Sequence, residues 1–226
     1  MLARAREGTV IAMILAAGRG ERLRPVTDKL PKALVEVRGR SLLETHLDAI
    51  KAVGVDTVII NLGWLGEQIV DRIGSGSDCG LNVIYSPEGD NLLETGGGIY
   101  RALPMLGSEP FLVVNADIVS DMPMPEADFD GQTLCKLIMV STPPYKTHGD
   151  FDIVDDRVCN SENPQLTFSG VAIYRPEFFA GCSAGSFPLA PLLRAAADAN
   201  QLAGDLYAGP WHDVGTVERL TALNRD

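Results

Sequence analysis

Two basic side chains, Arg22 and Lys32, follow a glycine-rich stretch near the start of the chain and could bind a polyphosphate. Gly18 and Gly20 let backbone N–H groups approach an anion closely, because no Cβ intervenes and unusual backbone angles cost little. Arg22 offers a planar fork for two phosphate oxygens, and Lys32 offers a point charge on a flexible stem. The pattern predicts a triphosphate-binding loop, with a basic surface loop between strand and helix as the alternative.

Two common phosphate-binding motifs do not fit this loop. A P-loop requires G-x-x-x-x-G-K-[ST], and no Lys-Ser or Lys-Thr follows these glycines. A dinucleotide fingerprint requires G-x-G-x-x-G, and Leu23 occupies the place of its third glycine. The sequence therefore indicates a nucleotide-binding loop of another kind.

The charge of the chain is unevenly distributed. The net charge is −11, which argues against general binding to nucleic acid or to an anionic membrane. Residues 19–40 nevertheless contain seven basic and three acidic residues, a local charge of +4 that leaves −15 for the remainder. A basic segment of this kind in an acidic protein suits a small polyanionic ligand.

Short apolar segments alternate with amphipathic ones over the first half of the chain. Strands are predicted at 10–15, 57–61, 81–85 and 111–115, and helices at 42–53, 66–73 and 97–106. The first helix has a capping box, in which Ser41 is the N-cap and Glu44 follows three residues later, and Gly54 ends it. Strands that alternate with helices predict an α/β fold with a doubly wound, mostly parallel, Rossmann-like sheet.

The second half of the chain has a different pattern. Strands are predicted there at 134–140, 151–154 and 166–174, and helices near 176–179, 189–199 and 216–224, whereas the first half also contains a short extended piece at 33–37. No linker rich in Gly, Pro or Ser separates the halves. We therefore expect one domain over residues 1–226, with a core at about 10–132 and a small mixed lobe and closing segment at about 133–226.

Composition places the protein among soluble, cytoplasmic proteins. No apolar run approaches the about 18 residues of a membrane span, and the first nine residues, MLARAREGT, lack the apolar core of a signal peptide. Four widely spaced cysteines form no C-x-x-C pair, so we expect them to be reduced and structural.

Two aspartates stand where they could bind a metal ion beside a triphosphate. Asp117 comes two residues after the apolar run 111–114, so it should emerge at the carboxyl edge of the sheet, where ligands bind in open α/β folds. Asp213 precedes the last predicted helix. Carboxylate oxygens together with phosphates are the ligands that Mg²⁺ prefers, although an Asx-turn or a favourable helix N-terminal position could explain either residue.

The order G-x-G-E-R-L-x-P, followed by P-K, resembles the signature of the sugar-1-phosphate nucleotidyltransferases, whose consensus is G-x-G-T-R-[LM]-x-P with a later P-K. The matching positions are Gly18, Gly20, Arg22, Leu23, Pro25, Pro31 and Lys32. Most members have Thr at the position of Glu21, whereas a muramic-acid-related branch of the family has Glu there. The family's N-G-D motif reads Asn115-Ala116-Asp117 here, and its W-x-D-x-G-T motif is complete from Trp211 to Thr216.

This resemblance implies roles for individual residues. It implies catalytic roles for Arg22 and Lys32 and a Mg²⁺ site at Asp117 and Asp213. It implies that the nucleotide is bound by Ala17, Gly18, Gly20, Glu21, Arg22, Lys32, Gly89, Thr95 and Gly96. It implies that the sugar is bound by Asn115, Gly149, Asp150, Ser169 and Gly170. A turn leading into a helix is the alternative for the glycines near Thr95, and an exposed loop residue is the alternative for Asp150.

Three longer segments, LAAGRGERLRP, SPEGDNLLETGGGI and LTFSGVAIYRPEFF, are most similar to one branch of the family. That branch transfers a uridylyl group from UTP to N-acetylmuramic acid α-1-phosphate and releases pyrophosphate, in peptidoglycan recycling. The alternatives are a mannose-1-phosphate guanylyltransferase or another NDP-sugar pyrophosphorylase, a cytidylyltransferase for a phosphorylated alcohol, and a non-catalytic sugar-nucleotide-binding regulator. The resemblance leaves the oligomeric state open, and a monomer is compatible with it.

Overall fold

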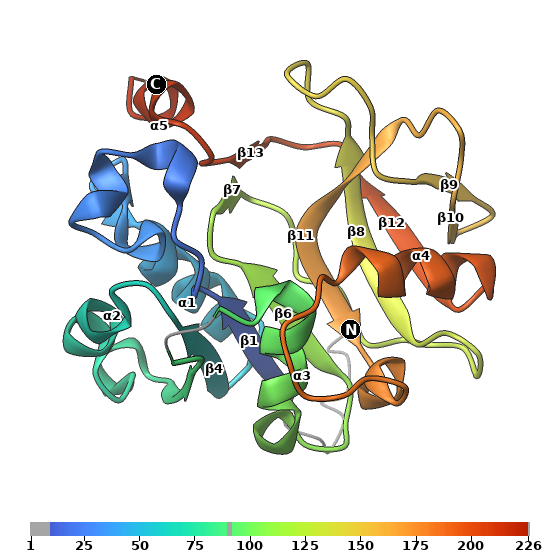
Figure 1. Cartoon of the computed structure of the whole chain (residues 1–226), viewed down its shortest axis with the longest axis horizontal. Coiled ribbons are helices and arrows are strands. Elements are labelled where there is room, and N and C mark those ends of the chain that lie inside the picture. Colours follow the sequence, from blue (N-terminus) through green and yellow to red (C-terminus); the bar gives the residue numbers. More distant parts are fainter. Residues whose placement is uncertain (1–9, 90–91, 226) are drawn as a thin grey trace, which may run out of the picture.

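The computed structural model describes residues 10–89 and 92–225 (Figure 1). The segment MLARAREGT, residues 90 and 91 of SPEGDNLLETGGGI, and residue 226 lie outside the described residues. The central element is a nine-stranded sheet of order β5-β4-β1-β6-β11-β8-β12-β10-β9. Its strands are β1 (Ile11–Leu15), β4 (Thr57–Leu62), β5 (Asn82–Pro87), β6 (Phe111–Asn115), β8 (Cys135–Ser141), β9 (Asp152–Val154), β10 (Arg157–Cys159), β11 (Leu166–Tyr174) and β12 (Leu202–Tyr207).

The half of the sheet made by β5, β4, β1 and β6 is parallel throughout. The chain leaves β1 for β4 and β5 on one side and later returns to β6 on the other side. The direction of winding therefore reverses between β1 and β6, and ligands bind beyond the carboxyl ends of strands at such a switch point. The predicted α/β class with a doubly wound parallel core is confirmed.

The strands after residue 133 extend the same sheet. β11 runs antiparallel to both β6 and β8, whereas β12 runs parallel to β8. The pairing of β11 with β8 shifts register between Phe168 and Ala172, which marks a β-bulge beside the end of β6. The mixed character expected for this half is confirmed, and its division from the core near residue 132 stays a prediction.

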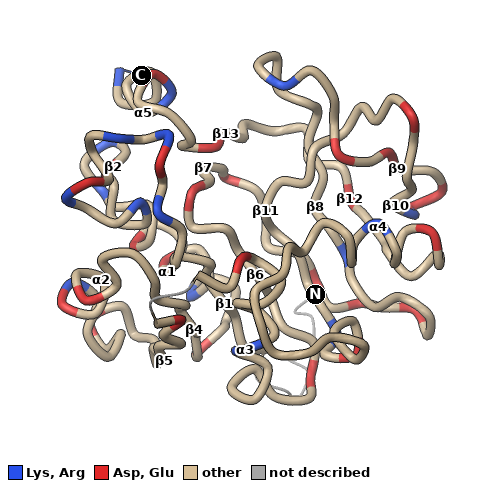
Figure 2. Tube along the Cα trace, viewed as in Figure 1, with Lys and Arg blue, Asp and Glu red and all other residues tan. Residues whose placement is uncertain are grey.

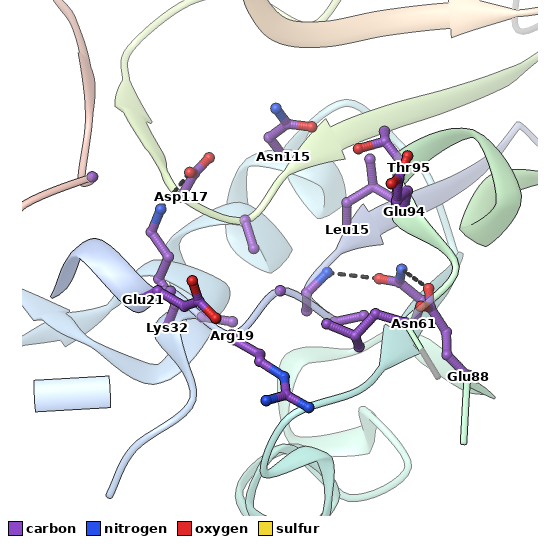
Figure 3. Close-up of a pocket in the computed structure, with 18 of the residues that line it drawn as sticks. Leu15, Arg19, Glu21, Lys32, Asn61, Glu88, Glu94, Thr95, Asn115 and Asp117 are labelled. Carbon is purple, nitrogen blue, oxygen red and sulfur yellow. Dashed lines mark hydrogen bonds and ion pairs between the residues drawn. The ribbon is translucent and has the colours of Figure 1, made fainter. Parts of the chain in front are cut away.

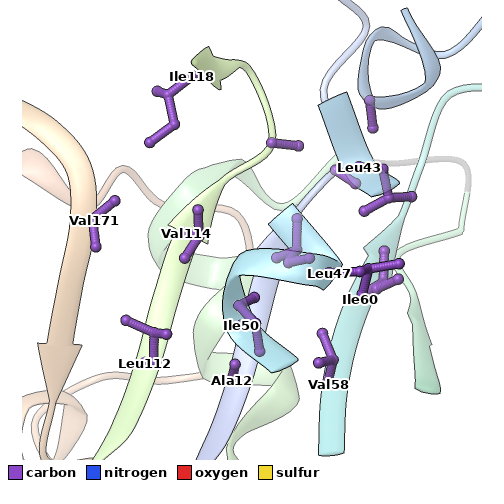
Figure 4. Packing of buried hydrophobic residues seen from close by; sticks show 14 of the residues in the cluster. Ala12, Leu43, Leu47, Ile50, Val58, Ile60, Leu112, Val114, Ile118 and Val171 are labelled. Carbon is purple, nitrogen blue, oxygen red and sulfur yellow. The ribbon is translucent and has the colours of Figure 1, made fainter. Parts of the chain in front are cut away.

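Helices cover both faces of the sheet. On one face lie α1 (Leu42–Ala52) and α2 (Gly66–Ile73), and on the other lie α3 (Glu94–Leu106), α4 (Ala190–Asp198) and the short 3-10 helix η5 (Pro176–Phe179). Successive residues of a strand point to opposite faces, so Ile14 packs in the first core and Met13 in the second. Figure 4 shows α1 against the strands, with Leu47 of the helix close to Ile60 of β4.

The last part of the chain returns to the first loop. β13 (Trp211–Asp213) pairs antiparallel with β7 (Ile118–Ser120), and α5 (Val217–Leu223) follows it. Val214 and Leu223 pack with Leu23, Val35 and Leu42 in a third, smaller core. In Figure 1 this closing segment lies beside the stretch that follows β1.

Most predicted elements are present, and the deviations have local causes. The capping box of α1 is confirmed, since the Ser41 hydroxyl accepts a hydrogen bond from the Glu44 N–H at 3.2 Å and the Glu44 carboxylate accepts one from the Ser41 N–H at 3.3 Å. The helix expected from residue 97 starts three residues earlier, at Glu94, so its glycines lie inside the first turns. The extended piece expected at 33–37 is a 3-10 helix, η3 (Lys32–Leu34), followed by β2 (Glu36–Val37), which pairs with β3 (Arg40–Ser41).

Four short or late strands, β7, β10, β12 and β13, were not expected from the sequence. The four cysteines are free, as expected. Within the part of the chain that the structure describes, no helix is long and apolar enough to cross a membrane.

Candidate active site

The glycine loop leaves β1 at Leu15 and reaches the 3-10 helix η1 (Glu21–Leu23). Gly20 has φ +63°, and a Cβ there would lie 2.9 Å from Thr27 Cγ2 and 3.2 Å from Lys32 Cβ. The Thr27 hydroxyl donates a hydrogen bond of 2.8 Å to the Gly20 carbonyl. Only glycine fits this position, and its close packing holds Lys32 against the loop.

A cavity of about 650 Å³ opens beside the loop, at the carboxyl ends of β1, β4 and β6. This is the switch point of the sheet, and the volume is in the range of small-molecule sites, roughly 300–1,000 Å³. The lining residues are Leu15, Ala16, Ala17, Gly18, Arg19, Gly20, Glu21, Arg22, Lys32, Ala33, Asn61, Glu88, Leu92, Glu94, Thr95, Asn115, Ala116, Asp117 and Gly215. In Figure 3, Lys32 and Asp117 lie on one side of the cavity, and Asn61, Glu88 and Thr95 lie on the other.

Lys32 and Asp117 meet on one wall of this cavity. Lys32 Nζ lies 2.5 Å from Asp117 Oδ2, and their side chains are 15% and 31% exposed (Figure 3). Asp117 emerges at the sheet edge, just beyond β6, as its spacing predicted. A phosphate bound by the lysine and a cation bound by the aspartate would therefore have to meet at this point.

The opposite wall is fixed by a buried polar network centred on Asn61. The side-chain Oδ1 of Asn61 accepts a hydrogen bond from the Ala16 N–H at 2.7 Å, and its side-chain Nδ2 donates one to Glu88 Oε1 at 2.7 Å. Glu88 Oε2 accepts a further bond from the Leu93 N–H at 2.8 Å. The network ties together the segments that follow β1, β4 and β5, which form this side of the cavity.

Gly98 of α3 packs directly against the same network. A Cβ at Gly98 would lie 2.6 Å from Glu88 Oε1 and 3.1 Å from Asn61 Nδ2. Because both oxygens of Glu88 are hydrogen-bonded, its carboxylate cannot move away freely. The glycines of α3 therefore serve close packing around the cavity wall.

Positive charge gathers at the mouth of the cavity. Figure 2 shows Lys and Arg along the segment that follows β1. Arg22 lines the cavity and is exposed, and it forms no ion pair with any residue in the described ranges. The guanidinium of Arg19 lies 5.5 Å from the ring centre of Trp64. The arrangement leaves Arg22 available to an anionic ligand.

Asp213 comes close to Asp117 through the pairing of β13 with β7. Asp213 lies opposite Ile118 in this ladder, and the Val214 N–H donates a hydrogen bond of 2.7 Å to the Asp117 carbonyl. Asp213 does not itself line the cavity, whereas Gly215, two residues later, does. The two aspartates that the sequence singled out are thus brought to one edge of the site.

Two neighbours hold the Asp213 carboxylate. Arg219 Nη1 donates to Asp213 Oδ1 at 2.5 Å, and the Tyr145 hydroxyl donates to the same oxygen. Partial burial, followed by the hydrogen bond to Asp213, raises the pKa of Tyr145 to about 12, so this hydroxyl remains a donor at neutral pH. The other carboxylate oxygen, Asp213 Oδ2, accepts no hydrogen bond from a described residue and can face a ligand.

The donor set fits a hard divalent cation that completes its shell with phosphate. Among residues 10–89 and 92–225 no group of three or more His, Cys, Asp or Glu side chains could hold a metal ion. Two carboxylates at a phosphate-binding edge are nevertheless what an ion such as Mg²⁺ uses when substrate phosphates supply further oxygens. Asp117 and Asp213 could therefore hold a cation only together with a polyphosphate.

A second cavity, of about 500 Å³, shares Glu94, Thr95 and Asn115 with the first and so continues from it. Its remaining lining residues are Asp150, Phe151, Phe168, Pro188, Leu189, Ala190, Leu193 and Arg194. These residues come from the mixed half of the sheet, from α4 and from the segment before α4. The two cavities together could hold a nucleotide and a second, smaller molecule side by side.

The structure brings together most of the predicted site residues. Among those assigned to the nucleotide, the first cavity is lined by Ala17, Gly18, Gly20, Glu21, Arg22, Lys32 and Thr95. Gly89 and Gly96 lie outside the lining, and Gly96 packs against Phe187. Among those assigned to the sugar, Asn115 lines both cavities and Asp150 the second. Gly149, Ser169 and Gly170 lie behind these walls, and their roles stay predictions.

Comparison with known proteins identifies the family. The family model described as "Nucleotidyl transferase" matches residues 11–148, from β1 to the loop before Asp150. The chain belongs to the nucleotidyl transferase family. The membership expected from the glycine loop is therefore confirmed.

Similar proteins of this nucleotidyl transferase family include two named N-acetylmuramate alpha-1-phosphate uridylyltransferase. The one from Neisseria meningitidis serogroup B is 48% identical over 92% of this chain and 94% of its own length. The one from Caulobacter vibrioides is 33% identical over 94% of each chain. A candidate glucose-1-phosphate thymidylyltransferase from Bacillus anthracis has the same fold, with a TM-score of 0.82 at 19% identity over 96% of this chain and 94% of its own.

Several lining residues of this nucleotidyl transferase were not predicted from its sequence. Asn61 and Glu88 are polar residues at the ends of buried strands, and that position is the signal that could have revealed them. Glu94 is exposed between the two cavities and has φ +58°, an uncommon angle for a residue other than glycine. Such backbone strain often accompanies a functional site, but it leaves no trace in the sequence.

Proposed function

We propose that this nucleotidyl transferase transfers a uridylyl group from UTP to N-acetylmuramic acid α-1-phosphate, giving UDP-N-acetylmuramic acid and pyrophosphate. The observation that carries the proposal is the pair of joined cavities, with Lys32 and Asp117 on the wall of the first. Two relatives that match almost the whole chain have this activity in their names. UTP as a substrate is consistent with a cytoplasmic protein.

The reaction is a direct displacement at phosphorus. An ionised oxygen of the sugar phosphate forms a bond to the α-phosphorus of UTP, and the bond from that phosphorus to the β-phosphate bridging oxygen breaks, releasing pyrophosphate. The attacking oxygen is already an anion, so no general base is needed. Catalysis then depends on positioning and on charge neutralisation.

The residues of the first cavity would supply both the positioning and the charge neutralisation. Lys32 would neutralise the charge that develops at the α-phosphate, and Arg22 would hold the β- and γ-phosphates as they leave. The loop glycines and Glu21 would contact the nucleotide together with Ala17 and Thr95. Asn115, at the junction, and Asp150, in the second cavity, would bind the sugar.

The oxygen-only donor set of Asp117 and Asp213 favours Mg²⁺ among the common divalent cations. When bound, this ion would supply further charge neutralisation at the α-phosphate. The Arg219 and Tyr145 contacts to Asp213 would orient that carboxylate for the ion.

Pyrophosphate release in the presence of Mg²⁺ tests the proposal. UTP, GTP, CTP and dTTP would each be offered with the 1-phosphates of N-acetylmuramic acid, N-acetylglucosamine, mannose and glucose. We expect the highest kcat/KM for UTP with the muramic acid phosphate. Preference for another pair would contradict the assigned substrates, and binding of UDP-sugars without any turnover would favour a regulator.

The metal assignment has a separate test. EDTA should abolish turnover, and Mg²⁺ should restore it. The Asp213→Asn variant should need more Mg²⁺ than the wild type for half-maximal rate. Full activity of the chelated enzyme would exclude a metal at these aspartates.

A further inference from the structure

We propose that Arg194 binds a carboxylate on the sugar and thereby selects an acidic sugar phosphate over a neutral one. The inference rests on the proposed function, because it concerns the muramic acid phosphate. N-acetylmuramic acid differs from the neutral N-acetylglucosamine by a lactyl ether that ends in a carboxylate. A site that distinguishes the two sugars needs a positive group where that carboxylate lies.

Arg194 is placed to be that group. Among the described residues that line the second cavity it is the only Lys or Arg, and it lies on α4. The first cavity, with Lys32 and Asp117, must hold the 1-phosphate for the reaction to occur. The sugar ring then extends past Asn115 into the second cavity, toward the part of its lining that contains Arg194.

Neutral partners hold the guanidinium of Arg194. Its Cζ lies 5.1 Å from the ring centre of Phe151, and Nη1 donates to Asn160 Oδ1 at 3.2 Å and to the Asp150 carbonyl at 3.4 Å. These contacts fix the orientation of the group without neutralising it. Nε and Nη2 donate no hydrogen bond to any described residue, so a fork remains for a carboxylate.

Three other cations of the same half are neutralised by acids, whereas Arg175, which does not line the cavity, contacts the Thr133 carbonyl and the Phe129 ring. Lys136 pairs with Asp205 at 2.9 Å, Lys146 pairs with Asp150 at 3.2 Å, and Arg157 pairs with Asp130. Arg194, in contrast, forms no ion pair within residues 10–89 and 92–225. The second cavity thus contains a charge that the fold itself does not balance.

Two carboxylates among the described lining residues, Glu94 and Asp150, could oppose such binding. Glu94 is exposed where the two cavities join and forms no ion pair with Arg194. Asp150 Oδ2 accepts hydrogen bonds from the Phe168 N–H at 3.0 Å and from Lys146 Nζ at 3.2 Å, so its charge is compensated by groups other than Arg194. Arg194 is exposed, and the apolar side chains of Phe151, Phe168 and Leu189 line the cavity beside it, so they offer no competing polar group. A bidentate contact to Arg194 is therefore the strongest one that this cavity can offer to an anionic substituent.

The test compares Arg194→Gln and Arg194→Lys with the wild type on two substrates, N-acetylmuramic acid 1-phosphate and N-acetylglucosamine 1-phosphate, with UTP. For Arg194→Gln we expect kcat/KM on the acidic substrate to fall about 10- to 100-fold, mainly through KM, as for loss of a charge-assisted hydrogen bond. Its kcat/KM on the neutral substrate should stay within about 2-fold. Arg194→Lys should keep the charge but lose the fork, and so fall in between.

Arg101→Gln is the matched control, because it removes one positive charge from an exposed position on α3 outside both cavities. The Arg101→Gln variant should keep the wild-type ratio of kcat/KM for the acidic substrate to kcat/KM for the neutral one. If Arg194→Gln kept that ratio too, because it lost no activity or lost it equally on both substrates, the inference would be overturned and the proposed function would stand. A wild type that does not use the acidic substrate would overturn the proposed function and the inference with it.

Discussion

The two cavities that meet at Asn115 are built in different ways. The first is formed by backbone and charged groups at the carboxyl ends of parallel strands, with Lys32 and Arg22 from one continuous loop. The second is formed largely by apolar side chains from Phe151 just before β9, from β11, and from α4 and the residues before it, with Arg194 as the one cation among the described lining residues. The contrast fits the roles proposed above, in which the first cavity neutralises charge during the reaction and the second selects its ligand by shape and by a single charge.

The largest effect should follow from removing the lysine of the first cavity. Lys32→Ala should lower kcat about 100-fold or more, in line with the loss of one group that stabilises transition-state charge. Steady-state kinetics with UTP and the muramic acid phosphate would measure it. The preference between acidic and neutral sugars should not change, because that preference is assigned to the second cavity.

Lys29→Ala is the control for this loop, since Lys29 is exposed and does not line the cavity. Its kcat should remain close to that of the wild type. A Lys32→Ala enzyme with normal turnover would remove Lys32 from the mechanism and with it the functional contrast between the cavities.

The cores beneath the two cavities should respond to opposite extremes of pH. His46 of α1 is buried below the first cavity, and this burial lowers its pKa from 6.5 to about 4. The folded protein therefore excludes a proton that the unfolded chain binds, so stability is complete above pH 6.5 and falls as the pH drops toward 4. The loss is on the order of 3 kcal/mol.

Urea unfolding of wild type and His46→Leu at pH 7 and pH 4.5 would measure this contribution. The variant should lose less free energy of unfolding between the two pH values than the wild type does. An equal loss in both proteins would assign the acid sensitivity to other groups.

Gly98→Ala should disturb the wall of the first cavity with a smaller effect. The added methyl group would press against the hydrogen-bonded carboxylate of Glu88, at a cost of about 1–3 kcal/mol for overpacking. Alanine regains about 1 kcal/mol of helix propensity, so the net destabilisation should be about 0–2 kcal/mol. The apparent affinity for UTP should fall as well.

Gly181→Ala offers a comparison, because a Cβ at Gly181 would meet no atom within 4 Å and its backbone is not left-handed. Thermal unfolding of both variants would separate the contact from the general effect of replacing glycine. Equal stability of the two would show that Glu88 can move aside.

The smallest effect is expected from Tyr174→Phe in the core beneath the second cavity. Burial, followed by the neighbouring Cys135 thiol, raises the pKa of Tyr174 above its usual value, and no described residue lies within hydrogen-bond distance and angle of its hydroxyl. Removal of this hydroxyl should change stability at pH 7 by less than about 1 kcal/mol, and the change should be neutral or favourable.

Alkaline pH should distinguish Tyr174→Phe from the wild type more clearly. The unfolded chain ionises Tyr174 near pH 10, whereas the folded protein does not, so the wild type loses stability as the pH rises above 10. The variant should lose less in the same urea titration. A large destabilisation at pH 7 would instead reveal a hydrogen bond of the hydroxyl in solution.

The sequence predicted the first cavity better than the second for a physical reason. The loop from Gly18 to Lys32 is continuous, and the rule that ligands bind beyond parallel strands placed Asp117 beside it. No role was predicted for Asn61 and Glu88 because the two side chains form their hydrogen bond across 27 residues of sequence. A local sequence pattern does not show which distant residue a polar side chain contacts.

The second cavity depends on contacts that are still more distant in sequence. Arg194 faces Phe151 and Asn160 only because β12 inserts between β8 and β10, and short strands with irregular pairing have weak periodic signals. The bulge between Phe168 and Ala172 likewise depends on the partner strand. The element types were therefore predictable in this half, whereas the side chains that share a cavity were not.

The third core joins a segment that is synthesised early to one that is synthesised late. Leu23 and Val35, which flank the loop that carries Lys32, are covered by Val214 and Leu223, and Asn224 accepts a hydrogen bond from the Arg38 N–H at 2.6 Å. Because a ribosome delivers the chain from its N-terminus, the loop that carries Lys32 is made early but lacks this support until the closing segment emerges. A nascent chain is therefore expected to stay inactive until residues 211–224 have been translated.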